Sequence, residues 1–140
     1  MSFRVTTNAN EVTKDITANV VRAEKLIKQT VDKATRQVQN HAKIKIQSPP
    51  KSGATYIRGG VTHKSSAEGE YPATDTGFLV SNITYAVRDF VGRVTSSAPY
   101  SKYLEYGTMD MRPRPFMSRA LEENRRKIVK MFKDASLISK

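Results

Sequence analysis

The first pattern in the chain is a thin apolar stripe near its start. The stripe repeats every eleven residues, and this period is close to the natural pitch of a straight α-helix. We therefore predict one long helix over residues 8–46, about 50–60 Å long at about 1.5 Å per residue. The rest of so small a chain cannot cover that length, so we expect part of the stripe to pack on another subunit; the alternative is a surface helix with a break. The stripe follows steps of four, four and three through Val12, Ile16, Val20, Ala23, Ile27, Val31, Ala34, Val38 and Ala42.

A proline pair ends this predicted helix. Pro49 and Pro50 follow Ser48, and proline both disfavours helical geometry in the preceding residue and cannot continue the hydrogen-bond ladder. The next segment is rich in Gly, Ser, Thr and Lys, and two short runs in it, 55–58 and 61–64, are separated by two glycines. That spacing fits a tight hairpin. We predict a mobile β-hairpin or loop that becomes ordered on assembly.

Short helices and strands are expected over the remaining half of the chain. Thr74 or Asp75 can cap a short helix by accepting its free backbone N–H groups. Leu79 and Ile83 lie four residues apart and are predicted to face the core. The pattern predicts the short helix near residues 78–83, antiparallel strands at 84–88 and 92–96, a second short helix at 98–106 and a last amphipathic helix at about 115–135.

Proline and glycine mark the limits of the second short helix. Pro99 suits the first turn of a helix, and Gly107 suits the left-handed position just past a helix end. The predicted fold class is α+β, with a long N-terminal helix, a small antiparallel β-sheet, a short helix and a C-terminal helix. We expect a single domain over residues 1–140, with the long helix at 8–46, a flexible loop or hairpin at 47–73 and an α+β core at 74–140.

The composition favours a protein that binds other macromolecules. Apolar residues make up 38% of the chain, and the formal net charge is +11 with a pI near 10.0. An apolar content this low favours a domain that leaves part of its apolar surface for partners. The charge favours nucleic acid or acidic protein surfaces. The basic residues predicted to face a DNA channel or an acidic partner are Lys25, Lys28, Arg36, Arg125, Arg126 and Lys130.

No catalytic, cofactor or metal site is expected. The chain has no cysteine, its two histidines, His41 and His63, have no metal-ligand spacing, and its acidic residues are scattered. No P-loop or dinucleotide fingerprint is present, and neither histidine lies in a nucleophile–base motif. The chain start lacks the apolar segment of a signal peptide, and no apolar run reaches membrane-spanning length. We therefore expect a soluble intracellular protein without a membrane partner.

Residues 100–121, YSKYLEYGTMDMRPRPFMSRAL, are the most distinctive run in the chain. Tyrosines and a leucine recur at helical spacings of three and four, which predicts an apolar ridge that packs on the sheet and a turn at Gly107. The predicted core of this motif comprises Tyr100, Tyr103, Leu104, Tyr106 and Gly107, together with Leu79 and Ile83.

The second half of this run is predicted to contact a neighbouring subunit. Proline fixes φ, so the alternating Arg-Pro pairs form a stiff segment that can hold Arg112 and Arg114 toward carboxylates of a neighbour. We expect Glu105 to bond backbone groups or an arginine of the following loop. The alternative is that the whole run only packs the last helix on the sheet. The candidate subunit or partner contacts are Arg112, Arg114, Glu105, Thr108 and Phe116.

Three landmarks give the second half of the chain a family resemblance. They are Asp75-Thr76-Gly77-Phe78-Leu79 with Ser81 and Ile83, then residues 100–108 ending in Glu-Tyr-Gly-Thr, and then Arg114-Pro115-Phe116 followed by Ala120-Leu121. In kind, order and interval they resemble the tail-completion (neck) protein family of long-tailed bacteriophages. The resemblance covers roughly residues 75–121; Ser101 departs from it where alanine is common, and residues 51–71 carry no landmark.

The resemblance implies a non-enzymatic virion protein. Such a protein would form a ring at the head–tail junction, with the sixfold symmetry that the resemblance suggests, and would be assembled in the cytoplasm of the bacterial host. Its expected partners are further copies of itself, other phage neck and tail proteins and the genomic DNA that passes through the ring. The residues themselves leave two alternatives: a standalone, sequence-independent DNA-binding protein, or a small nuclease or toxin dependent on Glu105 or His63.

Overall fold

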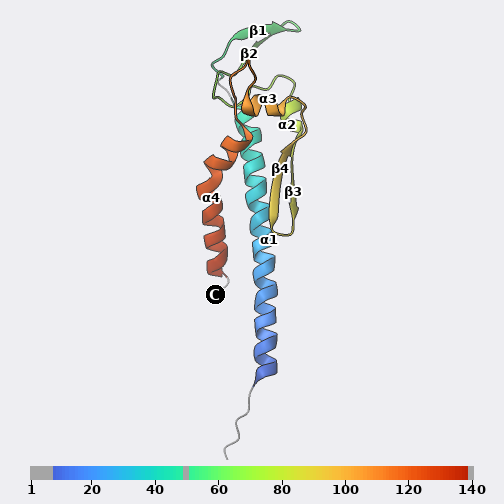
Figure 1. Ribbon diagram of the computed structural model, residues 1–140, viewed down its shortest axis with the longest axis vertical. Helices are drawn as coiled ribbons and strands as arrows, with labels where there is room; N and C mark the ends of the chain where they lie inside the picture. The colour runs from blue at the N-terminus through green and yellow to red at the C-terminus, as the bar shows by residue number, and fades with distance from the viewer. Residues whose placement is uncertain (1–7, 49–50, 139–140) are drawn as a thin grey trace, which may run out of the picture.

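The computed structural model describes residues 8–48 and 51–138 and shows an α+β protein built along one long helix (Figure 1). The predicted fold class is confirmed, and the strands form two separate antiparallel hairpins, β1–β2 and β3–β4. The elements are α1 (Ala9–Gln47), β1 (Thr55–Arg58), β2 (Val61–Lys64), α2 (Phe78–Ser81), β3 (Ile83–Arg88), β4 (Val91–Ser96), α3 (Ser101–Tyr106) and α4 (Met117–Ile138).

Helix α1 is a single uninterrupted helix of 39 residues. The predicted long helix is therefore confirmed, and the alternative of a helix with a break is wrong. The helix ends at Ser48, whose backbone N–H donates to the carbonyl of Ile44 and whose ψ of 128° is extended. The proline pair predicted to end the helix, Pro49 and Pro50, lies outside the described residues.

The two halves of α1 have different surroundings. Every buried residue of the helix lies between Thr30 and Ile46, whereas residues 9–29 contain none. Figure 1 shows the N-terminal half of α1 extending well beyond the other elements. The apolar stripe is thus packed over the second half of the helix and uncovered over the first.

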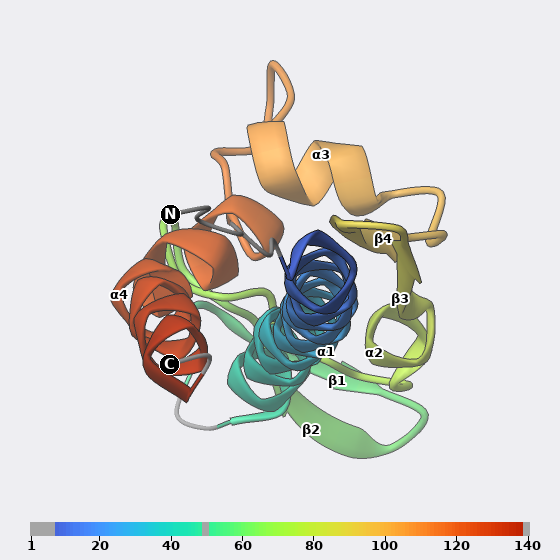
Figure 2. The same ribbon diagram turned by 90° about the horizontal axis from the view of Figure 1, so that it is seen from below.

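The core surrounds the C-terminal half of α1. This half contacts α4 on one side and the β3–β4 hairpin on the other, so α1 lies at the centre of the view along its axis (Figure 2). The largest fully buried apolar side chains are Phe116, Ile46 and Ile83. Leu79 and Ile83, predicted to face the core, are 4% and 0% exposed. The predicted core segment, residues 74–140, is therefore completed by residues of α1.

Small residues allow these elements to approach α1 closely. Ala34 and Ala42 are buried on the helix, and Gly92 of β4 lies against the buried side chain of Thr35. A Cβ atom at Gly92 would lie 1.8 Å from the Thr35 Oγ1, which is far inside van der Waals contact. The hydroxyl of Thr35 donates to the Val31 carbonyl at 2.7 Å, so it has no unsatisfied donor toward the strand.

The first hairpin, β1–β2, forms at the residues the sequence predicts. It is tied to the loop before α2, because the Asp75 carboxylate accepts a hydrogen bond from Arg58 at 2.7 Å and lies 2.9 Å from Nδ1 of His63. Asp75 therefore does not cap α2, as was one alternative. Helix α2 begins after Gly77, whose φ of 75° is left-handed, and the Gly77 N–H donates to the hydroxyl of Thr74 at 3.1 Å.

Substitution of the central core residue should test this packing. We expect Phe116→Ala to lower the free energy of unfolding by about 3–5 kcal/mol, because it removes a fully buried ring and leaves a cavity. Phe90→Ala is the matched control: Phe90 is 49% exposed, and we expect its loss to cost less than about 1.5 kcal/mol. Urea denaturation followed by circular dichroism measures both; equal losses would contradict the described core.

Candidate docking surfaces

Glu105 binds the first turn of α4. Its carboxylate accepts the backbone N–H groups of Phe116 at 2.9 Å, Met117 at 3.0 Å and Ser118 at 2.9 Å, and also the Ser118 hydroxyl. These N–H groups have no partner within the helix, and the negative charge lies at the positive end of the helix dipole. Glu105, from α3, therefore caps a helix that begins twelve residues later in the chain.

This cap corrects two predicted partner contacts. Glu105 is occupied within its own chain, as the prediction that it bonds backbone groups anticipated, and Phe116 is fully buried in the core. Partial burial raises the pKa of the Glu105 carboxyl, but the hydrogen bonds from Ser118, Phe116 and Met117 outweigh it and hold the pKa below 4.5. The carboxylate and the ring thus serve the fold rather than a neighbour.

The tyrosines in and just before α3 are exposed, so their prediction as core residues is wrong. Tyr100, Tyr103 and Tyr106 are 41%, 47% and 80% exposed, and only Leu104 of the predicted ridge packs against the core. Helix α3 has six residues, so a single side of it faces inward, and Leu104 and Glu105 occupy that side.

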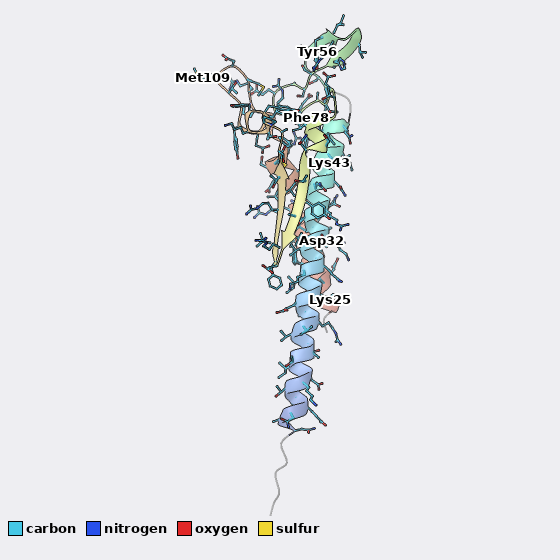
Figure 3. All side chains as sticks on the ribbon, turned by 90° about the vertical axis from the view of Figure 1, so that its right-hand side faces the viewer. Lys25, Asp32, Lys43, Tyr56, Phe78 and Met109 are labelled. Carbon is cyan, nitrogen blue, oxygen red and sulfur yellow. The ribbon has the colours of Figure 1, made fainter. Side chains whose placement is uncertain are left out.

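These tyrosines belong to a wider exposed surface, which we call the aromatic end. Phe78 lies 6.2 Å from the Tyr100 ring, and Met109 is fully exposed in the loop after α3. Figure 3 shows Phe78 and Met109 at the end of the molecule opposite the uncovered half of α1. The aromatic end comprises Phe78, Tyr100, Tyr103, Tyr106 and Met109.

The loop after α3 separates the two predicted contact arginines. Arg114 is partly buried and donates from Nε to the Ser66 carbonyl at 3.1 Å, whereas Arg112 is exposed. Gly107 closes the helix with φ 78°, and a Cβ atom there would lie 2.7 Å from the Met111 carbonyl. Thr108 is exposed, and its hydroxyl accepts the Met111 N–H within the same turn at 3.1 Å. Arg112 is thus the arginine that a neighbour can reach.

A polar cluster around Glu123 joins three distant segments. The Glu123 carboxylate lies 2.6 Å from Nε2 of His41 in α1. It accepts a hydrogen bond from the Tyr71 hydroxyl at 3.0 Å and another from Nε of Arg119 at 2.8 Å. The Arg119 guanidinium also lies 4.9 Å from the centre of the Tyr71 ring. Partial burial raises the pKa of Glu123, but the bonds from His41, Arg119 and Tyr71 prevail and hold it at about 2. The sequence analysis missed this cluster.

The uncovered half of α1 is the second candidate surface. Val12, Ile16 and Val20 are each between 52% and 58% exposed, and Ile27 is 42% exposed. They follow the same stripe that Val31 continues into the core. Contiguous apolar surface of this kind on a free chain marks a site of association.

The predicted basic residues fall on two helices. Arg125, Arg126 and Lys130 line a shallow hollow on α4 together with Val129, Lys133 and Asp134. On α1, Lys28 lies over the Phe90 ring at 5.4 Å, and Arg36 pairs with Asp32 at 3.1 Å while lying 5.4 Å from the Tyr85 ring. Among these predicted cations, the set on α4 therefore forms the more concentrated positive surface.

Within residues 8–48 and 51–138, no three His, Cys, Asp or Glu side chains are grouped as metal ligands require. Over those same residues, every buried side-chain N or O atom has a hydrogen-bond partner. None of the described helices combines the length and apolarity needed to cross a membrane. Comparison of this chain with family models, curated proteins and solved structures found no match.

The Glu123 cluster should make stability depend on pH. The pKa of the Glu123 carboxyl is about 2 in the folded chain, below its ordinary value of 4.5. Its contribution to the free energy of unfolding is therefore fully present above about pH 4.5 and is lost as the pH falls toward 2. We expect Glu123→Gln to destabilise the protein at about pH 6 and to differ less from the unmodified chain at about pH 3.

Urea midpoints at both pH values measure this effect. Glu122→Gln is the matched control, because the Glu122 side chain is 71% exposed and lies no closer than 3.6 Å to Arg125. We expect it to leave the midpoints almost unchanged. A Glu123→Gln variant with the same loss at both pH values would show that the carboxylate charge is unimportant.

Proposed function

We propose that this chain is a structural virion protein of a tailed bacteriophage, which forms a ring at the head–tail junction and enables head–tail joining. The observation that carries the proposal is the pair of uncovered apolar surfaces at opposite ends of one elongated chain. These are the aromatic end and the N-terminal half of the α1 stripe. A chain with two such surfaces is suited to assembly rather than to acting alone.

The resemblance of residues 75–121 to tail-completion proteins supplies the biological setting. In this fold its three landmarks lie at scaffold positions: Gly77 starts α2, Gly107 ends α3 and Phe116 fills the core. The landmarks thus account for a framework that presents the aromatic end and Arg112. Under this proposal, the chain and the tail-completion proteins would have the same framework, and the residues that contact neighbouring subunits could differ.

In this proposal the partners are further copies of the chain and the neighbouring neck and tail proteins. Sixfold symmetry is the number that the resemblance suggests. Genomic DNA would pass through the ring, and the basic hollow of α4 would face either that DNA or an acidic neighbour. The role is non-enzymatic, the protein resides in the virion, and assembly takes place in the host cytoplasm.

Replacement of the exposed contacts should separate assembly from folding. In a phage lacking its own copy of this gene, we expect a Tyr106→Ser, Arg112→Ala variant to lower the yield of infectious particles at least about tenfold, the effect of about 1.4 kcal/mol. The melting temperature should stay unchanged, because both side chains are exposed. Electron microscopy should show unjoined heads and tails accumulating.

An exposed apolar residue away from the aromatic end provides the control. Ile44 lies on α1, is 60% exposed and is absent from the stripe. We expect Ile44→Ser to support normal particle yields. Normal yields from the Tyr106→Ser, Arg112→Ala variant would refute the contact role of these two residues.

A standalone DNA-binding protein is the second candidate, favoured by the basic hollow of α4. Three of its lining residues, Arg125, Arg126 and Lys130, lie within six positions of one helix, and the chain carries a net charge of +11. Such a surface binds phosphates without regard to sequence.

Salt titration of duplex binding by the isolated chain tests this candidate. If DNA binding is the function, the Arg126→Ala, Lys130→Ala variant should flatten the plot of log affinity against log salt concentration by about 0.9 for each lost phosphate contact. Lys14→Ala, on the uncovered half of α1, is the control and should leave the slope unchanged. Absence of binding at moderate salt would eliminate this candidate and leave the ring proposal intact.

A further inference from the structure

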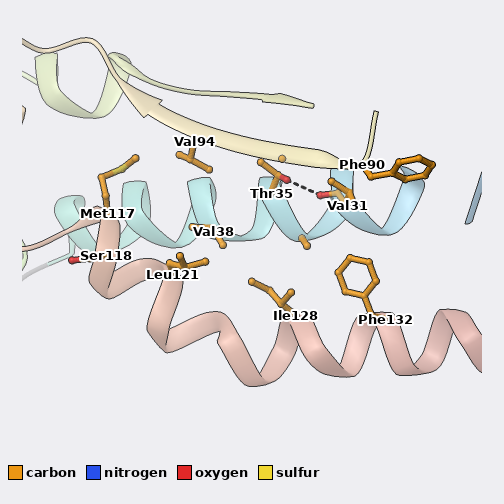
Figure 4. Close-up of a pocket in the computed structure, with 12 residues that line it drawn as sticks. Val31, Thr35, Val38, Phe90, Val94, Met117, Ser118, Leu121, Ile128 and Phe132 are labelled. Atoms are coloured by element: carbon orange, nitrogen blue, oxygen red, sulfur yellow. Dashed lines mark hydrogen bonds between the residues drawn. The ribbon is translucent and has the colours of Figure 1, made fainter. Parts of the chain in front are cut away.

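An open apolar groove of about 440 Å³ lies between β4 and α4, along one side of α1 (Figure 4). Its floor is the packed half of α1, and its two walls belong to different elements. Met117 lies toward one end, and Phe90 and Phe132 lie toward the other. The residues that define it are Val31 and Val38 on the floor, Val94 on the strand wall, and Leu121, Ile128 and Phe132 on the helix wall.

The floor of this groove and the uncovered stripe are parts of one apolar line. Val31 and Val38 continue the same steps along α1 that Val20 and Ile27 begin. In each copy of the chain this line is therefore flanked by two walls over its second half, whereas its first half contains no buried residue. Each copy of the chain therefore has one unfilled groove and one unpartnered amphipathic helix.

We propose that the groove receives the uncovered half of α1 from a second copy of this chain. The shapes correspond, because the floor is a helix and the walls follow it, which leaves a trough suited to another helix. An amphipathic helix that lays its apolar face into a hydrophobic groove is a recurrent mode of recognition. The inference rests on the proposed ring and identifies the contact that builds it.

Charge complementarity supports this choice of occupant. Glu11 and Asp15 lie one turn apart and directly beside Val12 and Ile16, so two acidic side chains flank the first part of the apolar row of the incoming helix. On α4, Arg125 lies in the same helical row as the groove residues Leu121 and Ile128, and its side chain is 73% exposed. Glu11 and Asp15 of the incoming helix can therefore pair with Arg125, which lies 3.6 Å from Glu122 of its own helix, as the apolar rows meet.

The contact joins two different surfaces of the chain, which determines the type of assembly. Stripe and groove lie on separate parts of each copy, so every copy can give one helix and accept one helix. Such heterologous contacts repeat until they close a ring or extend a filament. A direct pairing of two stripes would instead stop at a symmetric dimer.

Two complementary variants of the full chain test the contact. The stripe variant, Ile16→Asp with Val20→Asp, and the groove variant, Leu121→Asp, change only side chains that are more than 50% exposed, so we expect both to fold. Each variant alone should remain at the monomer mass of 15.7 kDa under conditions in which the unmodified chain assembles. An equimolar mixture should double that mass, because one intact helix still meets one intact groove.

A matched control and the contrary outcomes are measurable by sedimentation in the same series. Ile44→Asp places the same charge at an exposed apolar position outside both surfaces, and this variant should assemble as the unmodified chain does. Assembly of the Leu121→Asp variant by itself would overturn this contact while leaving a ring built by other contacts. An unmodified chain that stays monomeric at every concentration would also overturn the contact, and particle yields would then decide the ring proposal separately.

Discussion

The burial of one face of α1 between residues 30 and 46 is the interaction on which the tertiary structure depends. A hairpin of two strands is marginally stable by itself in water, and α4 is amphipathic, so each needs an apolar surface to cover. The second half of α1 supplies that surface to both, and the small residues Ala34, Ala42 and Gly92 let them approach it. Phe116 then fills the space where the elements converge.

Two carboxylates direct the elements that this burial brings together. Glu105 fixes α3 against the first turn of α4, and Glu123 links α4 to α1 and to the segment around Tyr71. Neither contact supplies much apolar burial. Because each carboxylate accepts hydrogen bonds from several donors at once, it fixes the direction in which α4 extends from the core rather than whether α4 forms. The exposed surfaces are therefore held on a well-defined framework.

The sequence predicted elements well and the orientation of short elements poorly. The eleven-residue stripe located α1 almost to the residue, and Gly59-Gly60 located the β1–β2 hairpin. The spacing of Tyr103 and Tyr106 could not show which side of a six-residue helix faces inward. The Glu123 cluster was beyond reach as well, because Tyr71 and His41 lie 52 and 82 positions away from Glu123 in the chain without any periodic signal.

The continuity of α1 imposes a rule on changes of its length. Successive residues of an α-helix are rotated by about 100° around the helix axis. A deletion near residue 29 would therefore rotate the uncovered stripe around the axis relative to the packed half. Removal of one residue would turn Val20 and Ile16 away from the face that Val31 defines, although every apolar side chain would remain. Removal of about eleven residues, three whole turns, would restore the face and shorten the reach by roughly 16 Å. The length of this helix can therefore change only in whole turns if the uncovered stripe is to stay on the same side of the helix as the packed stripe.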